Sequence, residues 1–229
     1  MEDIENEEED DRLQLKITLL GNSGVGKTCI IRRYISNEYE ENPESTRGAS
    51  YLNKIVERDN KLIQINLWDT AGQERYRSLG RHFYKNSFVV ILVYDITVRD
   101  SFEDLKNIWY NDLLKYGEKF NILAVVGNKV DCYEKEEVNE DEVRAFAKEK
   151  KAVFMTVSAK LGNNINILFN KLIDLFLDPN FQVKIEAMNS SDKDSVRLKS
   201  KKMNKTPKKR CQEANLLYHL ILIANSSII

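Results

Sequence analysis

Two patterns of hydrophobic residues alternate along this chain, and the first is typical of β-strands. Residues 13–19 and 62–68 place an apolar side chain at every second position, the period of a strand with one buried face. Residues 88–94 are continuously apolar, as in a strand buried on both faces of a parallel sheet. Residues 122–126 and 152–157 indicate two further strands.

The second pattern is helical. Apolar residues at helical spacing predict helices near 101–116, 140–149 and 163–177, and Asn163 or Asn164 is expected to cap the last one. Alternating strands and helices predict an α/β fold with a doubly wound parallel sheet. Ligands of such sheets bind at the carboxyl ends of the strands.

The segment between the first strand and the first helix carries a phosphate-binding pattern. Residues 21–28 form GNSGVGKT, which matches G-x-x-x-x-G-K-[ST], and residues 29–35 continue as a helix. Backbone N–H groups of such a loop turn toward phosphate oxygens, Lys27 reaches the β- and γ-phosphates, and Thr28 binds Mg²⁺. A glycine-rich turn without function is the alternative, which the flanking strand and helix disfavour. The residues expected to hold the phosphates are Ser23, Gly24, Val25, Gly26, Lys27, Thr28 and Cys29.

A second polar segment, DTAGQE at 69–74, follows the strand at 62–68. Asp69 is expected to hold Mg²⁺ through its water shell. Gly72 offers a backbone N–H near the γ-phosphate, and Gln73 can orient the attacking water because its amide both donates and accepts.

Two further segments predict a guanine pocket, NKVD at 128–131 and SAK at 158–160. Asp131 only accepts hydrogen bonds, and guanine presents two adjacent donors where adenine does not, so Asp131 discriminates between the bases. Asn128 is expected to tie this segment to the phosphate loop, and the aliphatic stem of Lys129 is expected to cover the base. The segment Ser158, Ala159 and Lys160 is expected to supply a backbone N–H for guanine O6.

Residues 37–53 show no clear periodicity and contain Pro43 and Gly48, which predicts a long polar loop. Long loops inside compact domains usually carry function. Tyr39 is expected to cover the second face of the base, with ordinary loop packing as the alternative.

The net charge of −1 conceals opposite charges at the two ends. Residues 2–11 are almost all acidic and residues 193–210 are strongly basic, so both ends are expected to be disordered tails. The basic tail is compatible with an anionic membrane or with nucleic acid, and the latter rests on this tail alone. The beginning of the chain has no apolar secretory segment, which favours the cytoplasm. Three separated cysteines indicate neither a disulfide framework nor a zinc site.

Together, GNSGVGKT, WDTAGQE, NKVD and SAK resemble, in order and spacing, the small GTPases of the Ras superfamily. Residues 68–76 and 92–97 resemble the Rab family, and residues 44–52 resemble its endocytic branch. The resemblance covers residues 13–178. It implies a P-loop GTPase fold with a six-stranded, mostly parallel sheet and about five helices, between an acidic segment at 1–12 and a tail at 179–229.

The resemblance also implies a GTP/GDP-dependent, Mg²⁺-dependent switch that regulates vesicle traffic and hydrolyses GTP slowly. Thr46 becomes the switch I threonine, and switch II runs from Gly72 to about Arg81. The implied catalytic residues are Gln73, Lys27, Thr46 and Gly72; the implied metal ligands are Thr28, Thr46 and Asp69; the implied effector contacts are Tyr51, Trp68 and Phe83. Packing beneath the switches is the alternative for these aromatics. The implied partners are an exchange factor, an activating protein and effectors, with the chain a monomer that cycles to endomembranes and binds no nucleic acid.

Three features depart from the Rab pattern. Arg47 stands where isoleucine is usual, and residues 82–87 match loosely. Cys211 follows a basic run, as a prenylation cysteine does, but eighteen residues follow it. Their apolar part, 216–224, is too short to span a bilayer. It either dips into a membrane surface or is absent from a natural chain that ends near Cys211.

The residues argue against two other functions. A scaffold held in one nucleotide state is disfavoured by the intact Thr46, Gly72 and Gln73. A P-loop ATPase or kinase is disfavoured by Asn128, Lys129 and Asp131.

Overall fold

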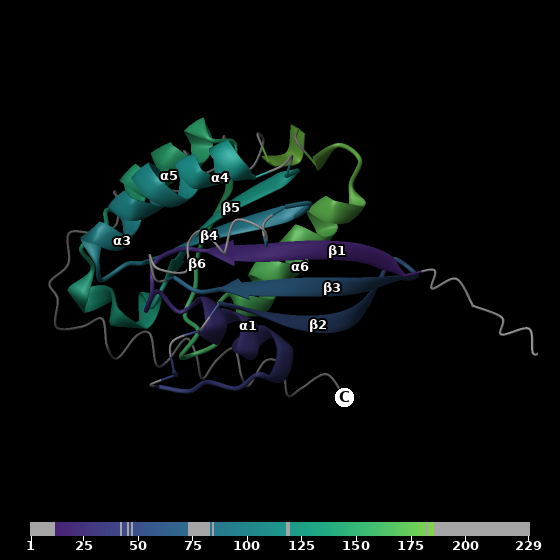
Figure 1. The fold of residues 1–229 in the computed structure, drawn as a ribbon, viewed down its shortest axis with the longest axis horizontal. Coiled ribbons are helices and arrows are strands. Elements are labelled where there is room, and N and C mark those ends of the chain that lie inside the picture. The colour runs from purple at the N-terminus through teal and green to yellow at the C-terminus, as the bar shows by residue number, and fades with distance from the viewer. Residues whose placement is uncertain are drawn as a thin grey trace, which may run out of the picture. The chain divides into compact units, whose positions relative to one another are not determined.

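A computed structural model of the chain has one six-stranded sheet at its centre (Figure 1). It describes residues 12–41, 43–44, 46, 48–72, 83, 85–117, 120–181 and 183–185, all within the compact unit 1–189. The strand order is β2-β3-β1-β4-β5-β6. The strands are β1 (Leu13–Leu20), β2 (Ala49–Arg58), β3 (Lys61–Thr70), β4 (Val89–Asp95), β5 (Ile122–Asn128) and β6 (Val153–Thr156). Only β2 is antiparallel to its neighbour, which confirms the mostly parallel six-stranded sheet.

Helices cover both faces of the sheet. The helices of the described residues are α1 (Lys27–Ser36), α3 (Arg99–Asp104), the π-helix η2 (Leu105–Trp109), α4 (Tyr110–Tyr116), the 3-10 helix η3 (Val130–Lys135), α5 (Glu140–Glu149) and α6 (Ile165–Leu177). The helices α1 and α6 share one core with the sheet, and α3, η2, α4 and α5 share the other (Figure 1). None of the helices in this part of the chain is both long and apolar enough to cross a membrane.

The central strand β4 shows why the sequence predicts this layering. Every residue of β4 is buried. Successive side chains point to opposite faces, so Ile91 and Val93 join the core under α1 and α6 while Leu92 and Tyr94 join the other core. A strand with a core on each side needs apolar residues at every position, and this is the pattern at 88–94.

The edge strand β2 belongs to the six strands implied by the resemblance, but no hydrophobic pattern located it in the sequence. It pairs along its whole length with β3, from Ala49 opposite Thr70 to Arg58 opposite Lys61. All ten of its side chains are exposed or half-buried, as expected for an edge strand with a single neighbour. Its hydrophobic alternation is therefore weak, and the polar loop expected to extend to residue 53 ends at Gly48.

The helix expected near 101–116 is confirmed, but it contains the π-helix η2 between α3 and α4, which no hydrophobic period signals. The expected side-chain cap of the last helix was wrong. Asn164 does precede α6, but its side chain makes no cap and instead donates from Nδ2 to the carbonyl oxygen of Thr156 at 2.8 Å.

The packed chain continues beyond Pro179, where the sequence suggested that the tail begins. Residues 183–185 are helical, and Ile185 is only 1% exposed in the core beneath α1 and α6. Phe181 packs against the same core and lies 6.0 Å from the ring of Phe88. The division into segments 1–12, 13–178 and 179–229 otherwise stays a prediction.

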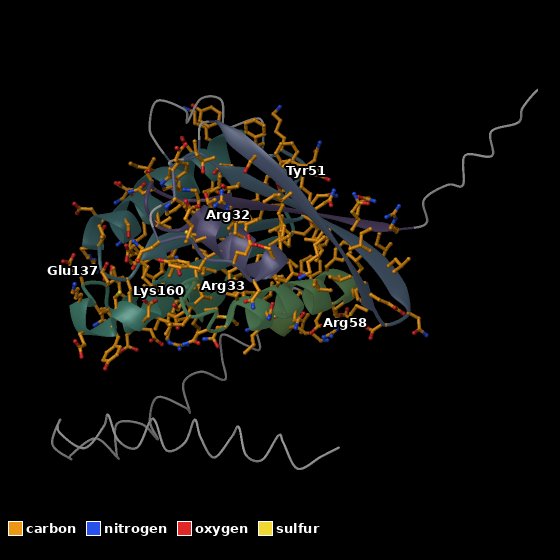
Figure 2. All side chains as sticks on the ribbon, turned by 90° about the horizontal axis from the view of Figure 1, so that it is seen from below. Arg32, Arg33, Tyr51, Arg58, Glu137 and Lys160 are labelled. Atoms are coloured by element: carbon orange, nitrogen blue, oxygen red, sulfur yellow. The ribbon has the colours of Figure 1, made fainter. Side chains whose placement is uncertain are left out.

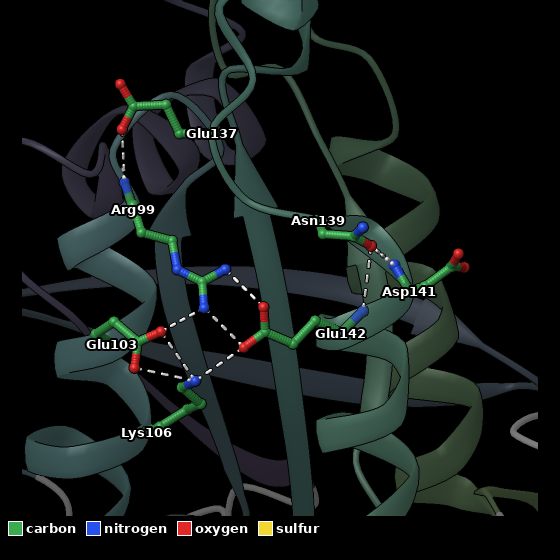
Figure 3. A network of polar contacts seen from close by, with 7 residues as sticks. All are labelled: Arg99, Glu103, Lys106, Glu137, Asn139, Asp141 and Glu142. Carbon is green, nitrogen blue, oxygen red and sulfur yellow. Dashed lines mark hydrogen bonds and ion pairs between the residues drawn. The ribbon is translucent and has the colours of Figure 1, made fainter.

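A network of ion pairs joins α3 and η2 to α5 (Figure 3). Arg99 donates to both carboxylate oxygens of Glu142, at 2.6 and 2.9 Å, and Lys106 donates to Glu142 at 2.9 Å. Both cations also bind Glu103. Hydrogen bonds from Arg99 and then Lys106 lower the pKa of Glu142 to about 2. At the start of α5, Asn139 Oδ1 accepts from the backbone N–H groups of Asp141 and Glu142, so this helix is anchored at its cap.

Candidate nucleotide site

A cavity of about 440 Å³ lies at the carboxyl ends of the strands, where parallel sheets bind their ligands. It is lined by predicted site residues from the phosphate loop and the start of α1, from the loop before β2, from the segment after β3, from the end of β5 and from the segments after β5 and β6. These residues are Ser23, Gly24, Gly26, Lys27, Thr28, Cys29, Tyr39, Thr46, Gly72, Asn128, Lys129, Asp131, Ala159 and Lys160. Its lining also includes Glu41, Pro43, Glu44, Thr70 and Cys132, for which no motif predicted a place in the site. The structure therefore brings the separate motifs to one place.

The phosphate loop connects β1 to the first residue of α1, as predicted. Gly26 has a φ of +94°, and a Cβ there would lie 2.3 Å from Nδ2 of Asn128, so only glycine fits. Lys27 is 5% exposed, and its Nζ donates to the carbonyl oxygens of Gly21 and Asn22 at 2.7 and 2.9 Å. Burial lowers the pKa of Lys27 to about 8, while the negative charge of Asp69 opposes this shift.

The three predicted metal ligands converge. Asp69 Oδ2 accepts from the hydroxyl of Thr28 at 2.6 Å and from that of Thr46 at 3.2 Å, and the two hydroxyl oxygens are 3.0 Å apart. Asp69 is 1% exposed, and its second oxygen, Oδ1, has no hydrogen-bond partner in the described part of the chain. Burial raises the pKa of this carboxyl, and the bond from Thr28 opposes the rise.

This oxygen set suits a particular class of cation. The described residues contain no group of three or more His, Cys, Asp and Glu side chains that could hold a metal by themselves. Mg²⁺ commonly takes one or two protein oxygens and completes its shell with water and substrate phosphates. One carboxylate with an unpartnered oxygen beside two hydroxyls fits that chemistry.

Gly72 lies directly against the phosphate loop. A Cβ at this position would lie 2.3 Å from the backbone nitrogen of Ser23 and 2.4 Å from the carbonyl carbon of Asn22. The close approach brings the backbone after β3 beside the loop that is expected to hold the phosphates.

Asn128 links the two halves of the site. Its Nδ2 donates to the carbonyl oxygen of Val25 at 2.9 Å, as the sequence analysis expected, and its Oδ1 accepts from the N–H of Ala159 at 3.1 Å. Asp131 Oδ1 accepts from the hydroxyl of Ser158 at 2.5 Å. The N–H of Ala159, one of those expected for guanine O6, is therefore engaged by Asn128 in this structure.

Two neighbours of this pocket were missed. Asp95, at the end of β4, forms an ion pair with Lys129 at 2.6 Å. Arg33 on α1 donates to the carbonyl oxygens of Ala159 and Lys160 at 2.9 and 2.8 Å, and its guanidinium lies 5.9 Å from the ring of Tyr39. No local pattern pairs residues more than 120 positions apart.

The predicted effector residues form a separate cluster outside the cavity. The ring of Trp68 lies 5.3 Å from that of Tyr51 and 5.2 Å from that of Phe83. Tyr51, on β2, is 45% exposed (Figure 2). Gln73, Arg47, most of the predicted switch II and Cys211 lie outside the described residues.

Comparison with known proteins agrees with this geometry. Residues 16–178 match the Ras family. The chain is 41% identical over 156 residues to the Ras-related protein Rab-22A of Mus musculus, covering 68% of this chain and 80% of that protein. It is 38% identical over 160 residues to the Ras-related proteins RHN1 of Nicotiana plumbaginifolia and Rab5 of Nicotiana tabacum, covering 70% of this chain and 80% of each. The chain thus belongs to the Ras family of small GTPases, in the endocytic branch of its Rab group, and is a guanine-nucleotide-binding, GTP-hydrolysing switch of membrane traffic.

Proposed function

We propose that the cavity at the carboxyl ends of the strands is the nucleotide site of this switch and that the predicted residues hold GTP and GDP there. The observation that carries the proposal is Asn128, which bonds both to the phosphate loop at Val25 and to the base segment at Ala159. One side chain thereby sets the spacing between a phosphate subsite and a base subsite.

The phosphate end has the groups that hydrolysis requires. Lys27 supplies a buried cation for the β- and γ-phosphates, Gly72 brings a backbone N–H to the loop, and Gln73 orients the attacking water. Thr28, Thr46 and Asp69 would hold Mg²⁺, which neutralises charge that develops on the phosphates when it is bound. With no arginine finger evident in the sequence, turnover is expected to be slow until an activating protein supplies one.

The base end explains the choice of guanine. Asp131 lines the cavity, and its Oδ1 accepts from Ser158, which fixes the orientation of the carboxylate. Adenine would cover this half-buried carboxylate without offering it a donor, at a cost of about 1–3 kcal/mol.

Thr46 and Gly72 account for the switching. They lie on either side of the site, Thr46 in the loop before β2 and Gly72 in the segment after β3. Losing the γ-phosphate removes their common contact and releases both segments. An exchange factor, an activating protein and effectors then act on these segments. The exposed edge of the Tyr51, Trp68 and Phe83 cluster supports effector binding at that surface.

We test the nucleotide roles by single-turnover GTP hydrolysis with and without an activating protein. Gln73→Leu is expected to keep nucleotide affinity and to abolish stimulation. Thr28→Asn is expected to weaken Mg²⁺·GTP far more than GDP, because it removes a hydroxyl beside Asp69. Unchanged stimulated hydrolysis in the first variant removes Gln73 from the mechanism, and equal loss of GTP and GDP in the second removes Thr28 from the metal site.

The membrane contact is a separate part of the proposal. The basic run at 193–210 attracts anionic lipid, and prenylation at Cys211 supplies the second signal that stable anchoring of a monomer on the cytoplasmic face of endomembranes requires. The intact mass of the protein from its own cells tests this. Added isoprenoid mass supports the anchor, and an unmodified chain contradicts it.

A further inference from the structure

The side chain of Asn22, the second residue of the phosphate loop, is bonded on both of its polar atoms. The indole Nε1 of Trp109 donates to Asn22 Oδ1 at 2.7 Å. Asn22 Nδ2 donates to Asp104 Oδ2, also at 2.7 Å. Neither partner belongs to the motifs that define the nucleotide site, and both come from the helical layer beside it.

The π-helix η2 is what allows both partners to reach Asn22. Asp104 is the last residue of α3, and Trp109, five positions later, is the last residue of η2. In an α-helix, residues five apart point about 140° away from each other. A π-helix closes i→i+5 bonds, as between the Tyr110 N–H and the Leu105 carbonyl, so residues five apart lie one above the other.

The backbone of Asn22 contacts Lys27 and Gly72, the two groups that the proposed site places against a γ-phosphate. Its carbonyl oxygen accepts from Lys27 Nζ at 2.9 Å. A Cβ on Gly72 would lie 2.4 Å from its carbonyl carbon and 2.5 Å from that oxygen. Any shift of the Asn22 peptide is therefore transmitted to both Lys27 and Gly72.

We propose that Asn22, Asp104 and Trp109 form a positioning triad, in which the π-helix holds the phosphate loop at the height where Lys27 and Gly72 can engage a γ-phosphate. This inference rests on the proposed nucleotide site and deepens it. Trp109 is 3% exposed, so loss of its acceptor leaves a buried donor unsatisfied. The bond to Asp104 is charge-assisted, which makes it stronger than a neutral one. The triad acts on the γ-phosphate side and leaves the guanine side untouched.

An exchange of the two polar residues tests the triad. Asn22→Asp places two carboxylates against each other and is expected to release GTP about tenfold faster, while GDP release changes less than about threefold. Asn22→Asp combined with Asp104→Asn keeps the net charge, restores a donor opposite the carboxylate and preserves the acceptor for Trp109. This double variant is expected to return GTP release and single-turnover hydrolysis to within about threefold of the wild-type chain.

Two more variants complete the design. Trp109→Phe removes the indole donor together with part of a buried ring, and it is expected to shift GTP release in the same direction as Asn22→Asp. Asn107→Ala changes an exposed residue of the same π-helix and serves as the matched control. Melting temperatures are measured for all variants, and Trp109→Phe decides if Asn22→Asp does not fold.

The outcomes separate clearly. Selective loss of GTP with rescue in the double variant supports the triad. Equal changes in GTP and GDP release, an absence of rescue, or a lower melting temperature without any nucleotide effect each overturn it. If the wild-type chain binds no guanine nucleotide at all, the assignment of the cavity fails, whatever the variants do.

Discussion

Asn128 donates to the carbonyl oxygen of Val25 at 2.9 Å, although the two residues are 103 positions apart. The bond joins the carboxyl end of β5 to the loop that follows β1. Because the Asn128 amide is buried and its bond connects the two halves of the proposed site, we expect its loss to weaken binding of both the base and the phosphates.

Asn128→Asp is expected to weaken GDP and GTP together by about 10- to 100-fold. The carboxylate replaces a donor by an acceptor, leaves the buried carbonyl of Val25 without a partner, and costs about 1–3 kcal/mol. Isothermal titration with each nucleotide measures the effect. Asn170→Asp, on the exposed face of α6, is the control for added charge. An affinity that stays unchanged would show that this bond does not hold the site together.

Nucleotide affinity is expected to fall as the pH rises above about 8, the pKa to which burial lowers Lys27. Phosphate oxygens favour the protonated amine, so binding takes up a proton in this range and affinity drops about tenfold from pH 7 to pH 9. The same shift makes the nucleotide-free protein gain stability between pH 8 and 10.5, because there the unfolded state binds more protons.

GDP titrations across this pH range measure the slope. Lys27→Met binds more weakly and is expected to lose this part of the pH dependence. Equal slopes in the two proteins would assign the titration to another group.

Asp131→Asn is expected to exchange guanine for xanthine. Xanthine carries an acceptor where guanine carries its amino group, and an amide can meet the resulting donor–acceptor pair. The amide oxygen can still accept from Ser158, so the local contact survives. Competition between GDP and xanthosine diphosphate is expected to favour guanine at least tenfold in the wild-type chain and xanthine in the variant. A variant that still prefers guanine would place the base discrimination elsewhere.

Gly72→Ala is expected to lower the affinity for GTP more than that for GDP. Its Cβ would overlap the backbone of Asn22 and Ser23, so the segment after β3 has to move away from the phosphate loop. Gly48→Ala is the matched comparison. Gly48 has a φ of +86° but open space around its Cβ position, so it bears backbone strain of about 1 kcal/mol without a collision. Stopped-flow release of both nucleotides distinguishes the two, and equal effects in both variants would mean that the close approach of Gly72 to the phosphate loop does not favour GTP.

Glu142→Gln is expected to destabilise the folded protein by at most about 1 kcal/mol at pH 7, because the ion pairs with Arg99 and Lys106 are partly exposed and screened by solvent. The pKa of Glu142 is lower in the folded protein than in the unfolded chain, where it lies near 4.5. The ion pairs therefore contribute their full stability above pH 4.5 and lose it as the pH falls toward 2. Urea unfolding at pH 7 and pH 3 measures the difference, with the exposed Glu57→Gln as control. A difference that grows in acid would contradict the assignment.

Local sequence patterns predicted the structure well where the type of each residue depends directly on its burial or backbone conformation. The apolar run of β4 required a core on each face, and the phosphate loop required glycine at Gly26, where Asn128 leaves no room for a side chain. They predicted little at β2, because its exposed side chains do not alternate between apolar and polar. They also missed η2, because a shift of one residue in the hydrogen-bond pattern does not require particular residue types.

Short motifs and periodic burial were enough to predict the sheet-and-helix alternation, the family and most of the residues that line the cavity. The distant groups that support these residues became known only from the fold. Arg33 behind Ala159, Asp95 against Lys129, and the pair that holds Asn22 are all brought together by the packing of helices on the sheet. Such contacts form between residues that are distant in sequence and close in space. A single sequence contains the order of the residues but not which of them come into contact.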